Sequence, residues 1–153
     1  MSMGECMRKG LLVKMPPDLQ KAHNSLTIAE AKLEIAKKEF NANIFEGAFI
    51  NAYTTMFHSA RALLFKDGIK ERSHYCLFLY ILEKYRDKIE MKYLNELNSL
   101  RMIRHKVMYG DDEEVTIREV EEAEAESAIK IAEGFLSTVR KIITAGCSPI
   151  PKA

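Results

Sequence analysis

The stretch LNSLRMIRHKVMYG, residues 97–110, holds four side chains that can do chemistry together: Arg101, Arg104, His105 and Tyr109. On a helix that turns about 100° per residue, Arg101 and Arg104 lie one turn apart, as do His105 and Tyr109. A guanidinium offers phosphate a forked pair of donors. An imidazole or a phenol can stack on a base or exchange a proton. The spacing therefore predicts a site that binds a phosphate and a base at the end of one helix.

Arg104 also falls within the apolar stripe of its own helix. The members of that stripe recur at helical spacing and are Leu97, Leu100, Ile103, Val107 and Met108. A stripe of this kind is expected to be buried, and an unpaired guanidinium is costly there. Two interpretations follow. Arg104 faces a cleft and binds phosphate, or it pairs with a carboxylate on a neighbouring helix, such as Glu39 or Glu46.

A second polar stripe runs along IFEGAFINAYTTMFHSARALLF, residues 44–65. One face of this helix is expected to be buried and consists of Ala48, Phe49, Ala52, Tyr53, Met56 and Ala60. The opposite face carries Gly47, Asn51, Thr54, His58 and Arg61. That face is polar but has few charges, which favours a cleft or a protein contact over open water. The alternative is that His58 is a surface histidine and Arg61 a solvated charge.

His74 opens the next helix, after the loop DGIKERS. Lys66, Lys70 and Arg72 give this loop a small positive cluster. Ser73 is expected to cap the helix that follows. Because His74 directly follows this positively charged loop, it is a candidate binding residue. The alternative is that it only packs at the start of the helix.

Metal and cofactor motifs are missing from the sequence. No two of the four histidines stand three or four residues apart, and HExxH, GxGxxG, GxxxxGK[ST] and GxSxG do not occur. Hydrolase, kinase and dehydrogenase sites therefore have no local support. We expect no metal site and no cofactor.

The elements that must position these residues are helical almost throughout. Five helices are expected, at about 17–41, 44–66, 74–88, 91–109 and 116–146. Thr116 and Glu119 predict a capping box at the start of the last one. No stretch shows strand alternation. The predicted fold is all-α, an antiparallel bundle with short connections.

Composition places the chain among ordinary globular proteins. Its 153 residues are 47% hydrophobic and 29% charged, with a formal net charge of +1. We expect an N-terminal extension at 1–15, one domain at 16–146 and a C-terminal tail at 147–153. We expect neither a membrane span nor a signal peptide. Cys6, Cys76 and Cys147 are expected to be reduced thiols in a cytoplasmic protein.

Three stretches together resemble a known family. They are AYTTMFHSARALLFKDG, then SHYC, then LRMIRHKVMYGDDEEV. In this order they look like a HEPN domain, and more narrowly like the small stand-alone HEPN proteins of archaea and bacteria. The resemblance covers residues 19–143. It implies a helical bundle that pairs as a homodimer, and a metal-independent ribonuclease motif, R-x4-6-H. It also implies pairing of the HEPN protein, as toxin, with a minimal nucleotidyltransferase as antitoxin.

The motif is degenerate in this chain. Arg104 matches the motif arginine and His105 the polar residue after it, but Tyr109 stands where the first possible histidine would be. A phenol, with an ordinary pKa near 10, is a poorer general base at neutral pH than an imidazole near 6.5.

The resulting prediction is a dimeric, toxin-like module that binds RNA or a nucleotide. Its candidate binding residues are Arg101, Arg104, His58, Arg61, Asn51 and His74. The alternatives are a weak ribonuclease that uses Arg104 with His105, Tyr109 or a histidine from elsewhere, and a structural partner of a nucleotidyltransferase.

Overall fold

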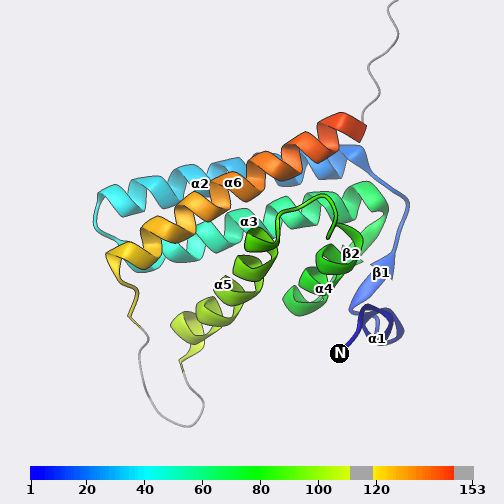
Figure 1. Cartoon of the computed structure of the whole chain (residues 1–153), viewed down its shortest axis with the longest axis horizontal. Helices are drawn as coiled ribbons and strands as arrows, with labels where there is room; N and C mark the ends of the chain where they lie inside the picture. The colour runs from blue at the N-terminus through cyan, green and yellow to red at the C-terminus, as the bar shows by residue number, and fades with distance from the viewer. Residues whose placement is uncertain (111–118, 147–153) are drawn as a thin grey trace, which may run out of the picture.

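The computed structural model describes residues 1–110 and 119–146, and in these it places six helices and two short strands (Figure 1). They are α1 (Met3–Arg8), β1 (Leu12–Lys14), α2 (Leu19–Asn41), α3 (Phe45–Asp67), β2 (Ile69–Glu71), α4 (His74–Lys84), α5 (Met91–Tyr109) and α6 (Glu122–Gly146). The prediction of an all-α fold is confirmed.

Helices α2, α3 and α6 pack along one another and form the largest part of the core (Figure 1). Apolar residues recur along α2 at steps of three and four, and this stripe is buried at Ala22, Leu26, Ala29, Leu33 and Ala36. The stripe does not reach Leu19, whose side chain is 48% exposed at the start of the helix. All six residues of the predicted apolar face of α3 are buried. Apolar burial along these helices is the main favourable term in such a bundle.

Helix α3 is the central element, because α4, α5 and β2 also pack against it. In the view of Figure 1, α4 and α5 lie below α3, and α2 and α6 lie above it. On α5, Leu97 and Leu100 are buried as predicted, and Ile103 and Val107 are half-buried. Met108 is 43% exposed, so its assignment to the buried stripe was wrong.

The helix ends follow the local sequence signals. Helix α3 ends at Gly68, whose φ of 81° is left-handed, a conformation that glycine adopts without a Cβ penalty. A Cβ on Gly68 would also lie 2.5 Å from the carbonyl oxygen of Met15. Helix α5 ends at Gly110 as predicted. Ser73 caps α4, because its hydroxyl accepts a hydrogen bond of 3.2 Å from the backbone N–H of Cys76.

Most of residues 3–14, which were expected to belong to an N-terminal extension, form helix α1 and strand β1. Strand β1 pairs antiparallel with β2, with Val13 opposite Lys70. The expectation that the chain contains no strand was therefore wrong. Each strand has only three residues, which is too short for alternation to stand out in a sequence.

A disulfide joins Cys6 on α1 to Cys76 on α4. Both cysteines are fully buried. The prediction of reduced thiols was wrong for this pair, because two cysteines 70 residues apart carry no local sign that the fold brings them together. Cys147 and the predicted tail lie outside the described residues.

Two helix boundaries differ from the prediction. Helix α6 begins at Glu122, so Glu119 precedes the helix and the predicted start was too early. Thr116 lies outside the described residues. Helix α4 ends at Lys84 instead of near residue 88. Its end is fixed by Asp67, whose carboxylate accepts hydrogen bonds from the hydroxyls of Tyr80 (2.9 Å) and Tyr85 (2.6 Å).

Candidate functional site

Two arginines on α5 stand over the faces of aromatic rings. The Cζ atom of Arg104 lies 5.5 Å from the ring centroid of Tyr53, on α3. That of Arg101 lies 4.9 Å from the ring centroid of Tyr75, on α4. Both arginines are half-buried. Cation–π contacts of this kind hold a guanidinium in place and leave its N–H groups available to a ligand.

No carboxylate among the described residues forms an ion pair with either guanidinium. Arg101 instead donates from Nε (3.2 Å) and from a terminal nitrogen (3.0 Å) to the side-chain oxygen of Asn98. The alternative in which Arg104 braces Glu39 or Glu46 is therefore not what the structure contains. Glu39 accepts a hydrogen bond from Asn51, and Glu46 is exposed.

His74 joins this site from the first turn of α4. Its Nδ1 lies 2.7 Å from the hydroxyl of Tyr53. Its ring stacks on Phe57, with centroids 4.2 Å apart and an interplanar angle of 15°. The Ser73 cap sets the direction in which α4 begins, and so brings the imidazole against α3.

The surroundings of His74 favour its neutral form. Burial, together with the positive charges of Arg104 and Arg101, lowers the pKa of His74 from 6.5 to about 4. His58 and Arg61 act in the same direction. The structure thus brings four of the predicted site residues close enough to influence His74.

Tyr53 connects the imidazole with the arginines. The residue is 1% exposed, and burial raises the pKa of its phenol, although the charges of Arg104 and Arg101 oppose the rise. The phenol therefore keeps its proton at neutral pH and remains able to donate to His74.

His58 and Arg61 lie beside this centre on α3. Burial lowers the pKa of His58 from 6.5 to about 4, with Arg61 and Lys32 contributing. Its Nδ1 has no hydrogen-bond partner among the described residues. Arg61 Nε lies 3.0 Å from a carboxylate oxygen of Glu71, although the N–H is not aligned for a hydrogen bond. Because Glu71 partly neutralises Arg61, this arginine is less available to a ligand than Arg101 or Arg104.

Three predicted site residues lie outside the centre. Asn51 donates its amide to Glu39, so it links α3 to α2. A Cβ on Gly47 would clash with that carboxylate, which explains the glycine. His105 and Tyr109 are exposed and contact each other, with ring centroids 5.0 Å apart. No contact joins either ring to Arg104 within the described part of the chain.

The sequence did not reveal the aromatic part of the site. Tyr53 was expected only in the core, and Phe57, Tyr75 and Asn98 were not singled out. The i, i+4 spacing of Tyr53, Phe57 and Arg61 was the one available signal, because it places all three on one side of α3.

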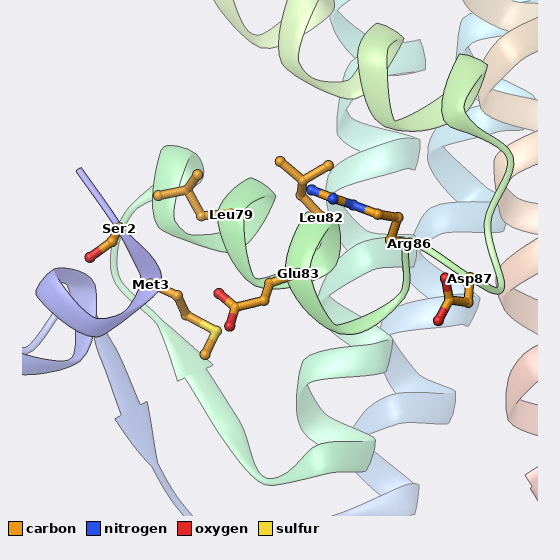
Figure 2. A pocket seen from close by; sticks show the side chains of 7 residues that line it. All are labelled: Ser2, Met3, Leu79, Leu82, Glu83, Arg86 and Asp87. Atoms are coloured by element: carbon orange, nitrogen blue, oxygen red, sulfur yellow. The ribbon is translucent and has the colours of Figure 1, made fainter.

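A separate cleft of about 420 Å³ lies between α1 and α4 (Figure 2). Figure 2 shows the side chains of Met3 and Glu83 pointing toward one another across it. Its lining residues are Ser2, Met3, Leu79, Leu82, Glu83, Arg86 and Asp87. None of the predicted site residues lines this cleft.

In residues 1–110 and 119–146, no His, Cys, Asp and Glu side chains form a group of three that could hold a metal ion. Within the same ranges, no helix has the length and apolar character that crossing a membrane requires. The chemistry at hand is therefore that of two guanidiniums, two neutral imidazoles and aromatic faces. Such a set binds an anion with an attached planar group.

The family model of the HEPN domain matches residues 22–142. The chain belongs to the HEPN family. A HEPN domain is all-α, in agreement with the observed fold. The chain is also similar to a Methanocaldococcus jannaschii protein named "Putative toxin MJ0605". The two are 29% identical over 123 residues, which cover 77% of this chain and 85% of the relative.

Proposed function

We propose that this HEPN protein is a toxin-like module that binds the phosphate backbone of single-stranded RNA, or a nucleotide, through Arg101 and Arg104. One observation carries the proposal. Both guanidiniums are held over aromatic rings, half-buried, with no carboxylate of the described residues paired to them. Burying a charge is costly without a partner, so a bound phosphate is the group that this arrangement lacks.

Aromatic residues around the arginines fit the same ligand. Tyr75 and Phe57 are half-buried rings beside the cations. Arg101 covers one face of Tyr75 and His74 stacks on one face of Phe57, so a base would stack on the opposite faces. Unpaired bases stack on such faces with little preference for sequence. The ligand class is therefore a phosphate attached to an unpaired base.

The toxin-like role rests on the family and on the name of the relative. We propose with it that the protein works as a homodimer, and that a minimal nucleotidyltransferase is its antitoxin partner. Light scattering tests the homodimer, for which we expect twice the 17.5 kDa of one chain. A mass of one chain at micromolar concentration would contradict the dimer.

RNA titration at increasing salt tests the binding directly. We expect affinity for a single-stranded oligoribonucleotide to fall as salt rises, because phosphate contacts release counterions. Arg101→Ala should weaken binding, whereas Arg140→Ala should not. Arg140 makes a matched control because it is an exposed arginine of α6 that pairs with Glu30. Equal effects of the two variants would show that binding is only nonspecific attraction to positive charge.

A second candidate function is weak, metal-independent cleavage of RNA. It is favoured by His74, because this histidine from another helix lies within electrostatic range of Arg104. Metal-free incubation with single-stranded RNA, comparing wild type with His74→Gln, tests it. Cleavage that persists in both proteins would assign the activity to another residue or to a contaminant.

A further inference from the structure

His74 is a half-buried base among cations, and its only polar contact among the described residues is to Tyr53. On α3 it faces Tyr53, His58 and Arg61, and on α5 it faces Arg101 and Arg104. Glu71 on β2 carries a carboxylate, and this carboxylate is paired with Arg61. Among the described residues, no carboxylate is one of the groups that act on the pKa of His74.

We propose that a phosphate bound at Arg101 and Arg104 places a proton on His74, which then becomes the third cation of the site. This inference rests on the proposed function, since it requires an anion to bind there. Binding of the anion is thus coupled to binding of a proton by the protein.

The negative charge of the ligand changes the electrostatic field at His74. In the free protein two guanidiniums repel a proton from His74, and burial removes the water that would stabilise the imidazolium. A phosphate monoanion between the guanidiniums offsets their field. The pKa of His74 therefore rises toward its ordinary value of 6.5 when the anion binds.

Tyr53 can form a hydrogen bond with both the neutral and the protonated imidazole of His74. With neutral His74, the phenol hydroxyl can donate to Nδ1 across 2.7 Å. With protonated His74, Nδ1–H donates and the phenol oxygen accepts. The phenol keeps its own proton throughout, because burial raises its pKa. Nε2 carries a hydrogen in both states, so protonation adds a positive charge beside the ligand and not a new donor.

The coupling between phosphate binding and proton binding is reciprocal. If a phosphate raises the affinity of His74 for a proton, then a proton raises the affinity of the site for phosphate by the same factor. We expect affinity to increase about tenfold when the pH falls from about 7 to about 5. This dependence distinguishes His74 from the arginines, which remain charged throughout that range.

Calorimetric titration with a short oligouridylate that has hydroxyl ends tests the proposal. Neither its phosphodiesters nor its bases change charge over this range, so any proton taken up binds to the protein. Measurements at pH 5.5 in two buffers of different ionisation enthalpy give the number of protons. We expect more than half a proton for wild type, little for His74→Gln, and wild-type uptake for the exposed control His105→Gln, and His58→Gln is measured alongside them.

Each outcome decides something different. Binding without proton uptake by wild type overturns the inference and leaves the proposed function standing, and it does so even if His74→Gln fails to fold. Uptake that His74→Gln keeps but His58→Gln loses assigns the proton to His58 and also overturns the inference. No binding at either pH contradicts the proposed function, and the inference falls with it.

Discussion

The hydroxyl of Tyr53 lies 2.7 Å from Nδ1 of His74, and this contact joins α3 to the first turn of α4. The guanidinium of Arg104 lies over the same phenol ring, with its Cζ 5.5 Å from the ring centroid. One buried residue of the central helix therefore positions both a base and a cation. The arginine in the apolar stripe of α5 is held by a ring, and its N–H groups remain free of carboxylates among the described residues.

The neutral histidines predict how stability depends on pH. His58 and His74 have pKa values lowered from 6.5 to about 4 in the folded protein. Between these values the unfolded chain binds protons that the folded chain does not, so the free energy of unfolding should fall as the pH drops from 6.5 to 4. Above 6.5 both states hold neutral histidines and this contribution is constant.

Urea denaturation at a series of pH values checks this. The slope per histidine should stay below about 1.4 kcal/mol per pH unit, because that is the limit for the uptake of one proton. A double variant, His58→Gln with His74→Gln, should show a shallower slope than wild type. Identical slopes would mean that neither histidine resists protonation.

The disulfide predicts a loss of stability on reduction. Cys6 and Cys76 are 70 residues apart, so the bond closes a long loop in the unfolded chain. Its removal should cost about 2–5 kcal/mol. Thermal melting with and without a reductant measures this, and the double variant Cys6→Ser with Cys76→Ser should no longer respond to reductant. A thiol titration that finds both cysteines free in the purified protein would contradict the bond.

A small substitution at Gly68 is expected to lower the stability of the protein strongly. Gly68→Ala places a Cβ on a residue with φ of 81°, 2.5 Å from the carbonyl oxygen of Met15. We expect a loss of about 2–3 kcal/mol in the free energy of unfolding, since the strain and the clash act on the same residue. Gly4→Ala is the matched control, because its nearest neighbour, the hydroxyl oxygen of Ser2, would be 3.8 Å away. Equal stability of the two variants would show that the chain at Gly68 can relax.

The sequence predicted those parts of the fold that long, regular patterns specify. The stripe from Ala22 to Ala36 and the polar face with His58 and Arg61 both have helical spacing, and both are observed. Glycine-terminated helix ends were found at 68 and 110 for the same reason, since a local signal is present.

Features that depend on distant contacts could not be predicted in this way. The pairing of Cys6 with Cys76 and of β1 with β2 joins segments more than fifty residues apart, and each segment is too short to carry a pattern. The candidate site likewise combines residues that a local pattern predicts with contacts that it does not predict. Arg101 and Arg104 were found from their spacing on one helix, but the contact between Tyr53 and His74 appears only when α3 and α4 are packed together.

Restoring the family motif tests why it is degenerate here. Tyr109→His places an imidazole at the spacing from Arg104 that the motif uses. Tyr109 is 62% exposed, so the change should leave stability within about 0.5 kcal/mol of wild type. We expect cleavage of single-stranded RNA without metal to increase in this variant, because an imidazole is the better base near neutral pH. His105→Gln, one turn away, is the control that should not gain activity. No gain in Tyr109→His would show that the spacing alone does not supply the missing function.

The most direct test of the central claim is to measure RNA affinity and thermal stability together on Arg104→Ala. If Arg104 is a phosphate ligand, losing one charge-assisted contact of roughly 1.5–3 kcal/mol weakens binding by about ten- to a hundredfold. Stability should change by about 1–2 kcal/mol, because the cation–π contact of this half-buried guanidinium lies between the exposed and the desolvated cases. The opposite result is a fall of about 3–5 kcal/mol in stability, as for a broken internal ion pair, while the remaining folded protein binds RNA as tightly as wild type. That result would contradict the account.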